Sequence, residues 1–370
     1  MGDHFPDRYE SSMNDIRVIA INPGSTSTKI AVYQNAEAIF LKTIRHTTEE
    51  LTPFTRVTDQ FQFRKKIVLQ QLINADIEMQ NVRAIMGRGG LLKPMESGVY
   101  EVNEAMIHDL QHRTFREHAS NLGGLIAHDL AAGLPDAKAY IADPIVVDEL
   151  DDIARIAGHP LFQRISIFHA LNQKAIARDF AKSVQRKYED MNLIVAHMGG
   201  GISVGAHQRG RVIDVNQGLD GEGPFSPERS GTLPVGELIT ICFEGHYSEA
   251  EIRRMVTGGG GLVAYLGTND AAEVEKMVEA GDKNARLIYG AMAYQVSKYI
   301  GEMFTVLKGN VDAILITGGI AYDKLFVSWI QERVYRLAPV HIYPGEDEMR
   351  ALAMNGLMVI RGEITPKVYV

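Results

Sequence analysis

The stretch IAINPGSTSTKIAVY, residues 19–33, joins two hydrophobic runs through a segment of small and hydroxyl-bearing residues. The hydrophobic runs predict two β-strands. The segment between them, residues 24–28, contains two serines and two threonines, although a tight turn needs only Gly with Asn or Asp. Phosphate oxygens only accept hydrogen bonds, so hydroxyls and free backbone N–H groups suit them. The stretch predicts either a phosphate-binding hairpin or an exposed Ser/Thr-rich hairpin.

The plan of this stretch returns in the second half of the chain. Residues 17–40 and 192–215 each contain a hydrophobic run, a turn with glycine, a second run, a polar turn and a third run. The turn glycines Gly24 and Gly199 are 175 residues apart, about half of the 370 residues. This long period predicts a duplicated domain rather than a solenoid. Two such hairpins facing each other could hold the phosphates of a nucleotide.

Strand-like and helix-like segments alternate along the chain, which predicts an α/β fold. The strands are expected at 18–21, 29–33, 84–86, 139–142, 193–196 and 313–317. An amphipathic helix is expected after His169, with Ile176, Phe180 and Val184 on its apolar face and Lys174, Arg178, Lys182 and Arg186 elsewhere. A long helix is expected at about 285–307, with one apolar stripe formed by Ile288, Met292, Tyr299, Met303 and Val306.

Composition narrows the class of protein. A chain of this length predicts two domains, and 45% hydrophobic with 23% charged residues is typical of a globular protein. No apolar run is long enough to cross a bilayer, and the polar N-terminus argues against a signal peptide. The single cysteine, Cys242, excludes an intramolecular disulfide and favours a reducing, cytoplasmic location. A net charge of −8 without a basic cluster argues against nucleic-acid binding.

Other nucleotide and metal motifs fail on inspection. A Walker A loop needs Gly-Lys, and the sequence contains no such pair. Residues 259–264 approach a dinucleotide fingerprint, but the preceding residues predict a helix instead of the required strand. His108 and His112 have the spacing of a zinc hydrolase motif, yet Asp109 stands where that motif needs Glu. We interpret these two histidines as part of a solvated helix face.

Several blocks resemble the actin, sugar-kinase and heat-shock chaperone superfamily, and within it the acetate and butyrate kinase family. The clearest are NPGSTSTK, GRGGLLKPMESGVYEVN, HASNLGG, YIADPIVVDEL, SIFHALNQKAIAR, HMGGGISVGAHQRGRVIDVNQGLDGEGPFSPERSGTLP and LITGGIAYDKLF. They extend from Asn22 to Phe326, and PGEDEMRALAMNGLMVIRGE carries the likeness to Glu363. Two features depart from the acetate kinases of this family. Pro23 replaces their cysteine, and the arginine loop is MGRGG. These departures favour an acyl acceptor longer than acetate.

The resemblance implies two duplicated actin-like (ribonuclease H-like) domains, each a mixed sheet flanked by helices, with the active site in the cleft between them. The expected N-terminal domain covers 1–147 plus 350–370 and handles acyl group and phosphate. The second, 148–349, binds the nucleotide and forms a homodimer or larger homo-oligomer. The implied reaction is reversible, Mg²⁺-dependent phosphoryl transfer between ATP and butanoate, giving butanoyl phosphate and ADP. Another short or branched-chain acid, such as isobutyrate, valerate, propionate or acetate, is the alternative acceptor, and a membrane partner is not expected.

The chemistry of this reaction favours cations over a general base. A carboxyl group with a pKa near ~4–5 is already ionised at pH 7, so the obstacle is the approach of an anion to a polyanionic phosphate. By resemblance, Arg88 and Arg229 clamp the carboxylate and the phosphoryl group, because a guanidinium can bond two oxygens at once. His169 is implied to stabilise the phosphoryl transition state. A sugar kinase would instead need an Asp base, and an actin-like nucleotide switch would need no acyl site.

The remaining implied residues fall into three groups. The expected ligands of nucleotide phosphate and adenine are Asn22, Ser25, Ser27, Lys29, His197, Gly199, Gly200, Gly201, Gly318, Gly319 and Ile320. The metal is assigned to Asp143 together with Glu346 or Glu348, with Asp347 left open as an alternative. The substrate pocket is assigned to Gly90, His118, Asn121, Phe168 and Pro224. Gly90 stands where acetate kinases carry valine, so its missing side chain is expected to leave room for a longer acid.

Overall fold

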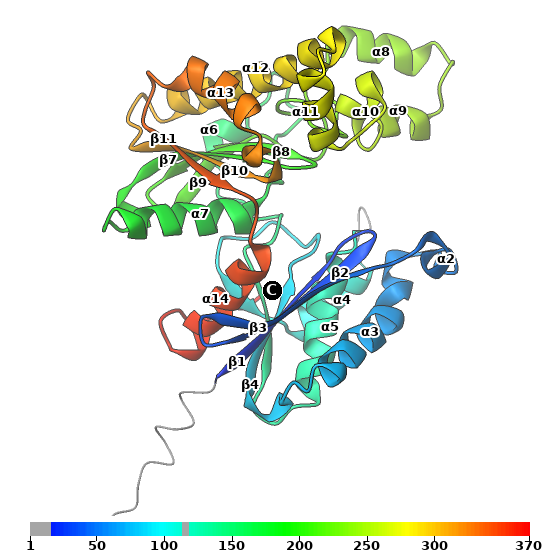
Figure 1. The fold of residues 1–370 in the computed structure, drawn as a ribbon, viewed down its shortest axis with the longest axis vertical. Helices are drawn as coiled ribbons and strands as arrows, with labels where there is room; N and C mark the ends of the chain where they lie inside the picture. The colour runs from blue at the N-terminus through cyan, green and yellow to red at the C-terminus, as the bar shows by residue number, and fades with distance from the viewer. Residues whose placement is uncertain (1–15, 113–117) are drawn as a thin grey trace, which may run out of the picture. The chain divides into compact units, whose positions relative to one another are not determined.

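The computed structural model describes residues 16–112 and 118–370. Contacts divide the described chain into two compact units (Figure 1). Unit 1 comprises the described residues up to Val146 together with Asp347–Val370, and unit 2 comprises Val147–Glu346.

Unit 1 is built on a six-stranded mixed sheet in the order β3-β2-β1-β4-β6-β5. Strands β1, β4 and β6 run parallel to one another, whereas β2, β3 and β5 each pair antiparallel with their neighbours. The strands are β1 (Arg17–Pro23), β2 (Ser27–Gln34), β3 (Glu37–Arg45), β4 (Val82–Arg88), β5 (Val99–Glu101) and β6 (Lys138–Ala142).

Helices cover both faces of this sheet. Figure 1 shows α14 on one side and α3, α4 and α5 on the other. Residues that alternate along β1 serve the two layers: Ile19 and Ile21 join the core cluster that contains Leu122 of α5, whereas Val18 lies against Gly356 of α14. The helices are α2 (Thr48–Leu51), α3 (Phe61–Asn74), α4 (Glu104–His112), α5 (Asn121–Ala132) and α14 (Glu348–Ile360), with 3₁₀ turns at Val57–Gln60 and Met79–Asn81.

Unit 2 is built on a five-stranded sheet in the order β11-β10-β7-β8-β9. Strands β7, β10 and β11 are parallel, and β7, β8 and β9 form an antiparallel meander. The strands are β7 (Asn192–Met198), β8 (Ile202–Gln208), β9 (Arg211–Val215), β10 (Ala313–Gly318) and β11 (Val340–Pro344). This sheet repeats the arrangement of β1, β2 and β3, so the predicted duplication is confirmed.

The helices of unit 2 pack against both faces of its sheet. Ile194 and Ala196 face the cluster that contains α12, whereas Leu193 and Val195 face α7. The helices are α6 (Asp152–Arg155), α7 (Ala170–Ser183), α8 (Val235–Phe243), α9 (Glu249–Val256), α10 (Gly261–Leu266), α11 (Ala271–Glu279), α12 (Lys283–Val306) and α13 (Lys324–Val334), with 3₁₀ turns at Tyr188–Asp190 and Gly319–Tyr322. A helix, α9, precedes residues 259–264, as the sequence predicts.

Strands are present at all six predicted ranges, the internal repeat also predicts β3, β8 and β9, and β5 and β11 were not predicted. Helix α7 follows His169 as expected, but two of its side chains differ from the prediction. Val184 lies just after the helix and is 42% exposed. Lys174 is fully buried, because its ammonium reaches the Glu149 carboxylate at 2.6 Å and the Gly210 carbonyl oxygen at 2.8 Å.

Helix α12 has its expected position, but its buried stripe is offset from the predicted one. Met292 and Met303 are buried as predicted, whereas Ile288, Tyr299 and Val306 are partly exposed. The stripe is completed instead by Ala285, Tyr289, Val296 and Ile300. The predicted and observed stripes share Met292 and Met303 and differ in which neighbouring apolar residues face the core.

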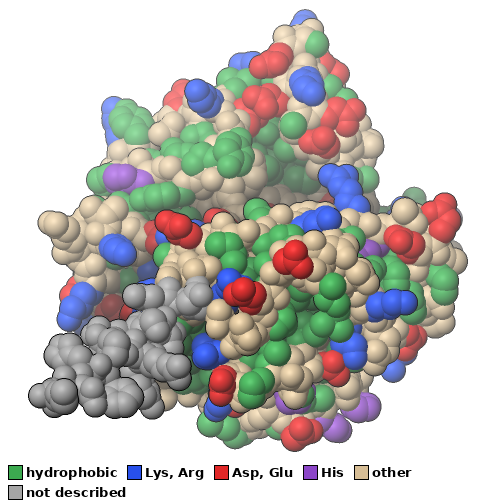
Figure 2. Space-filling model, turned by 60° about the horizontal axis from the view of Figure 1, so that its bottom comes forward, with side chains coloured by type: hydrophobic (Ala, Val, Ile, Leu, Met, Phe, Trp, Pro, Cys, Tyr) green, Lys and Arg blue, Asp and Glu red, His purple; other side chains and the backbone are tan. Residues whose placement is uncertain are grey.

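The surface is mixed in character. On the face in Figure 2, Lys and Arg side chains are interspersed with Asp and Glu side chains, and hydrophobic side chains lie between them. His108 and His112 lie on α4 and are exposed, in agreement with a solvated helix face. Among the helices of the described residues, none has the length and apolar character needed to cross a membrane.

Candidate active site

Three predicted residues of unit 1 lie at one edge of its sheet. Because β1, β4 and β6 are parallel, their carboxyl ends lie at the same edge. Asn22 is next to last in β1, Arg88 is the last residue of β4, and Asp143 directly follows β6. Arg88 pairs in register with Ala142, the residue before Asp143. Such carboxyl edges are where open α/β sheets bind ligands.

Glu348 holds two of these residues in place. Its Oε2 accepts a hydrogen bond from Asn22 Nδ2 at 2.7 Å and forms an ion pair with Arg88 Nη1. Glu348 is the first residue of α14, where the helix dipole stabilises a negative charge. Its side chain is only 9% exposed and that of Arg88 20%. The neighbouring Asp347 caps α14 by accepting a hydrogen bond from Arg350 N. Of the three acidic residues left open by the sequence, Asp347 is the one used as a helix cap.

Asp143 is buried and held in an unusual backbone conformation. Its Oδ1 accepts hydrogen bonds from Ser97 Oγ at 2.6 Å and from Gly98 N at 2.9 Å. Its φ is +38°, a region that non-glycine residues seldom occupy and that is often found at functional sites. The carboxylate is thus fixed at the sheet edge by two donors.

The first predicted phosphate hairpin is braced by an arginine that the sequence analysis missed. Ser25 is exposed, Ser27 and Lys29 are partly buried, and Lys29 pairs in register with Asn22. The fully buried Arg64 of α3 donates to the carbonyl oxygens of Gly24, Ser25 and Ser27 at 2.8, 3.1 and 2.9 Å. Burial lowers the pKa of Arg64 to about 10. No local motif marks Arg64, because it lies in a helix that contacts the hairpin only in the folded chain.

The loop after Arg88 packs directly on the start of α5. Asn121 Oδ1 accepts a hydrogen bond from Leu91 N at 2.8 Å, while its buried Nδ2 has no hydrogen-bond partner among the described residues. A β-carbon at Gly90 would lie 2.6 Å from Asn121 Cα and 2.9 Å from its backbone nitrogen. The expectation that Gly90 leaves room for the substrate is therefore wrong. The space beside its Cα is filled by Asn121.

His118 precedes α5 and is exposed. Its Nδ1 accepts a hydrogen bond from Ser120 N at 3.2 Å and lies 2.7 Å from Ser120 Oγ. Because Nδ1 accepts from the backbone, the neutral ring carries its proton on Nε2. His118 can therefore donate one hydrogen bond to an anion.

Unit 2 presents an equivalent sheet edge. Strands β7, β10 and β11 end there, with His197 paired in register with Thr317 and Gly318 with Pro344. His197 occupies the position in β7 that Asn22 occupies in β1. The predicted glycines 199–201 form the turn from β7 to β8, and Gly318 ends β10. Glu346 Oε2 lies 3.4 Å from His197 Nε2.

His169 and His197 are stacked in unit 2. Their ring centroids are 3.8 Å apart and their planes differ by 13°. His169 is the N-cap residue of α7, and its Nδ1 lies 2.9 Å from Ser203 Oγ. His197 is almost fully buried, and its Nδ1 lies 2.7 Å from Asn172 Oδ1. Both imidazoles are thus fixed by partners from α7 and β8.

Arg229 lies over the glycine turn. A β-carbon at Gly201 would overlap Nη1 of Arg229, so a larger residue here would displace the guanidinium from this position. Nη1 donates to the Gly218 carbonyl oxygen, whereas the buried Nε has no hydrogen-bond partner among the described residues. Burial lowers the pKa of the Arg229 guanidinium. Such a partly desolvated cation with an unused donor suits an anionic ligand.

Three predicted contact residues are buried in the protein instead of exposed to a ligand. Phe168 packs in a cluster with Val147 and Leu150. Ile320 is 5% exposed and belongs to the main core of unit 2, so its side chain serves packing, although Gly319 beside it is exposed. Pro224 is also buried. The family resemblance implied ligand contacts for these three residues, whereas their side chains are buried in this structure.

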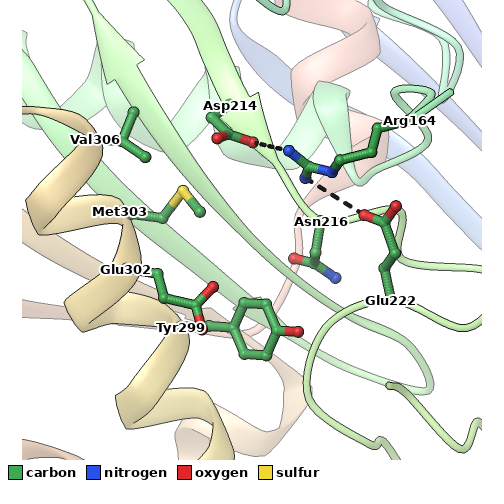
Figure 3. A pocket seen from close by; sticks show the side chains of 8 residues that line it. All are labelled: Arg164, Asp214, Asn216, Glu222, Tyr299, Glu302, Met303 and Val306. Carbon is green, nitrogen blue, oxygen red and sulfur yellow. Dashed lines mark hydrogen bonds and ion pairs between the residues drawn. The ribbon is translucent and has the colours of Figure 1, made fainter. Parts of the chain in front are cut away.

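A cavity of about 270 Å³ lies elsewhere in unit 2 (Figure 3). Arg164 forms ion pairs with Asp214 at 3.0 Å and Glu222 at 3.4 Å, and α12 supplies Glu302 to the wall. Burial raises the pKa values of Asp214 and Glu302, although Arg164 opposes the shift of Asp214. The predicted site residues are not among those that line this cavity.

Comparisons with known proteins agree with this arrangement. A family model described as the acetokinase family matches residues 159–336. The "Probable butyrate kinase" of Bacteroides thetaiotaomicron is 55% identical over 354 residues, which is 96% of this chain and 100% of that protein.

Solved structures agree as well. The acetate kinase of Porphyromonas gingivalis superposes with a TM-score of 0.78 at 16% identity, over 93% of this chain and 100% of that chain. A propionate kinase from Francisella tularensis gives 0.74 at 17% identity, over 92% and 98%. At this identity the structures establish the shared fold, which confirms the predicted α/β architecture of duplicated actin-like domains.

Proposed function

The chain belongs to the acetokinase family, and from this premise we propose that it is a butyrate kinase, which transfers the γ-phosphoryl group of ATP reversibly to butanoate. The products are butanoyl phosphate and ADP. The observation that carries the proposal within unit 1 is Arg88. It ends β4 at the carboxyl edge of the sheet and is held by Glu348, and Asn121 packs on the loop that follows Arg88.

These donors match a carboxylate acceptor. Butanoate is ionised at pH 7, so no group needs to remove a proton from it. It needs positive charge and N–H donors to approach the phosphoryl group in line. Arg88 supplies the charge and Asn121 Nδ2 supplies a neutral donor. When the acid binds, Asn121 Nδ2 gains an acceptor that it lacks among the described residues.

Arg229 and His169 act on the phosphoryl group. In a loose transition state the charge spreads over three equatorial oxygens, which N–H donors stabilise. Arg229 offers its buried Nε, and His169 offers the ring nitrogen opposite Ser203. Both side chains are fixed by neighbours before the ligand arrives, so little reorganisation is required.

Nucleotide phosphates bind the hairpin of residues 24–28 and the turn of residues 199–201. Arg64 supports this role because it occupies the carbonyl oxygens of the first hairpin, which would repel phosphate. The described residues contain no cluster of three or more His, Cys, Asp or Glu that could hold a metal alone. Mg²⁺ carried by a nucleotide needs only one or two carboxylates. We assign these to Asp143, with Glu346 or Glu348 as the second acidic partner.

The acyl preference is the finer part of the proposal. The relative named "Probable butyrate kinase" supports butanoate, and the kinases of shorter acids share the fold. A sugar kinase would require an aspartate base, and Asp143 is held by two hydrogen-bond donors. Isobutyrate, valerate, propionate or acetate remain the competing acceptors.

We also propose that the protein acts in the cytoplasm as a homodimer or larger homo-oligomer. Unit 2 exposes large apolar side chains close together in sequence, with Ile153 and Leu161 84% exposed and Phe162 68%. Exposed apolar groups of this size favour self-association. The variant Phe162→Glu should lower the molar mass measured by light scattering. Phe243→Glu makes the same test at another exposed aromatic side chain, at the end of α8.

The arginines provide the test of the proposed function. We expect Arg88→Ala and Arg229→Ala each to lower kcat by about 10²–10⁴, as for the loss of one charge-stabilising contact in the transition state. Matched controls are Arg83→Ala, at the opposite end of β4, and Arg253→Ala, on the exposed face of α9. Acyl hydroxamate formation from ATP and butanoate measures the rate, and circular dichroism checks folding. Normal kcat in a folded Arg88 or Arg229 variant would remove that arginine from the mechanism.

A further inference from the structure

A chain of buried polar side chains runs inward from His169. His169 Nδ1 lies 2.9 Å from Ser203 Oγ, and Ser203 Oγ lies 2.9 Å from Gln173 Nε2. Gln173 Oε1 lies 2.9 Å from His207 Nε2, and His207 Nδ1 lies 2.7 Å from the hydroxyl of Tyr188. Ser203, Gln173 and His207 are 0% exposed. We call Ser203, Gln173, His207 and Tyr188 the inner relay.

The orientation of Gln173 fixes the inner end of the relay. Gln173 Nε2 also lies 3.1 Å from the carbonyl oxygen of Ser203, which can only accept a hydrogen bond. The amide nitrogen must therefore face Ser203, and Oε1 faces His207. Because Oε1 only accepts, His207 carries its proton on Nε2, and its Nδ1 accepts from Tyr188. Burial, together with the nearby Lys174 and Arg178, lowers the pKa of His207 well below its usual value, so the ring is neutral.

The same reasoning fixes the outer end. Ser203 Oγ accepts a hydrogen bond from Gln173 Nε2 and a longer one, 3.4 Å, from the backbone N–H of His169. These two bonds use both acceptor sites of the hydroxyl. Its one proton is then available to His169 Nδ1, at 2.9 Å. His169 Nδ1 is thus an acceptor, and its proton lies on Nε2.

We infer that the inner relay of Ser203, Gln173, His207 and Tyr188 positions His169 and fixes it as the neutral tautomer that carries its proton on Nε2. This inference deepens the proposed function and rests on it, because the donor at Nε2 is what an equatorial oxygen of the transferring phosphoryl group needs. The relay residues are positioning residues, since they act on the phosphoryl group only through the His169 ring, which Ser203 Oγ contacts at Nδ1. Each bond polarises the next in the same direction, so the Nδ1 hydrogen bond is strengthened.

The fold supports the relay with a close approach. Gly205 lies between Ser203 and His207 on β8, and a β-carbon there would lie 2.6 Å from Gln173 Oε1. The absent side chain leaves the space that the Gln173 amide occupies. The His169 ring also stacks on His197, which restricts its rotation. His197 pairs in register with Ser203, so both contacts to His169 come from neighbouring positions of β7 and β8.

Nitrogen NMR of the full-length protein tests the tautomer directly. The protein is labelled with [¹⁵N]histidine, and the His169 signals are identified by their loss in His169→Gln. At pH 7.5 we expect a protonated Nε2 and an unprotonated, hydrogen-bonded Nδ1. In Ser203→Ala the two tautomers should mix. A wild-type His169 that is protonated on Nδ1, or on both nitrogens, would overturn the inference.

Kinetics test whether the relay matters for turnover. We expect Ser203→Ala to lower kcat about tenfold, as for one lost buried hydrogen bond, while KM for ATP and the acid changes less than about twofold. Tyr188→Phe, at the remote end, should give a smaller fall in kcat and keep the fold. The matched control is Ser297→Ala in α12, which also removes the hydroxyl group of a buried serine. In the structure described, the Ser297 hydroxyl donates a hydrogen bond to the carbonyl oxygen of Ala293, in the same helix.

Unchanged kcat in both Ser203→Ala and Tyr188→Phe would overturn the positioning role. The spectra need no turnover, so they separate this inference from the proposed function. A wild-type protein without carboxylate kinase activity would refute the proposed function. The NMR spectra would still show which ring nitrogen of His169 carries the proton, and therefore the direction of its hydrogen bond to Ser203.

Discussion

Replacing Gly90 by alanine tests how the loop after Arg88 is built. The new β-carbon would lie 2.6 Å from Asn121 Cα and 2.9 Å from its backbone nitrogen, whereas ordinary contacts begin at 3.4 Å. Both atoms belong to the backbone of α5, so no rotamer change can relieve the overlap. Overpacking of this kind costs about 1–3 kcal/mol, and losing the hydrogen bond from Leu91 N to Asn121 adds about 1 kcal/mol. We expect the free energy of unfolding to fall by about 2–4 kcal/mol.

The assay combines urea unfolding with initial rates for acetate and butanoate. We expect kcat/KM to fall by similar factors for both acids, because Asn121 and Arg88, which we propose to bind the carboxylate common to both acids, would be displaced. The control is Gly133→Ala, whose new methyl group would find its nearest atom, the Leu130 carbonyl oxygen, at 3.6 Å. The reasoning is refuted if Gly90→Ala keeps wild-type stability and loses only butanoate, since Gly90 would then face the acyl chain.

Three further perturbations have defined outcomes. Arg64→Met should destabilise unit 1 by at least about 3 kcal/mol and raise KM for ATP, because several charged hydrogen bonds to the hairpin carbonyls are lost; equal effects in the exposed Lys66→Met would contradict this. The folded protein keeps His207 neutral, whereas the unfolded chain protonates it near pH 6.5. Stability should therefore fall as the pH drops from 7.5 to 5.5, by about 1.4 kcal/mol more in wild type than in His207→Gln; parallel losses in denaturant unfolding would exclude this role. Asp143→Asn should raise the Mg²⁺ concentration for half-maximal activity more than KM for butanoate, because an amide is a poorer ligand for a hard cation; an unchanged Mg²⁺ requirement would leave Asp143 a purely structural residue.

The positions of Asn22, Arg88 and His197 at strand ends could be predicted from the sequence. Each follows a short hydrophobic run, and the internal repeat places Asn22 and His197 at equivalent points. The hydrophobic periodicity and the glycines that end each run indicate where a strand stops, and both are local features of the sequence. The same signals correctly indicate that a helix, and no strand, precedes residues 259–264.

Contacts between distant segments could not be predicted in this way. Arg64 reaches the hairpin from α3, and Glu348 reaches Asn22 from the far end of the chain. Lys174 has the sequence context of a solvated face, yet it is buried because Glu149 lies within 2.6 Å. Gly90 is a second example, because a glycine in the sequence can indicate either a close approach of two backbone segments or free space for a ligand. Only the fold distinguishes these cases.

The rate of ATP-dependent phosphorylation of butanoate, compared with acetate, tests the central claim most directly. ADP release by the purified wild-type protein with Mg²⁺ is followed over a series of concentrations of each acid. Burying the two additional methylenes of butanoate is worth about 1.6 kcal/mol, so kcat/KM should favour butanoate roughly fifteenfold. Hydroxylamine should trap the product as butanoyl hydroxamate. Release of ADP that does not depend on a carboxylic acid, or a preference for acetate, would contradict the account.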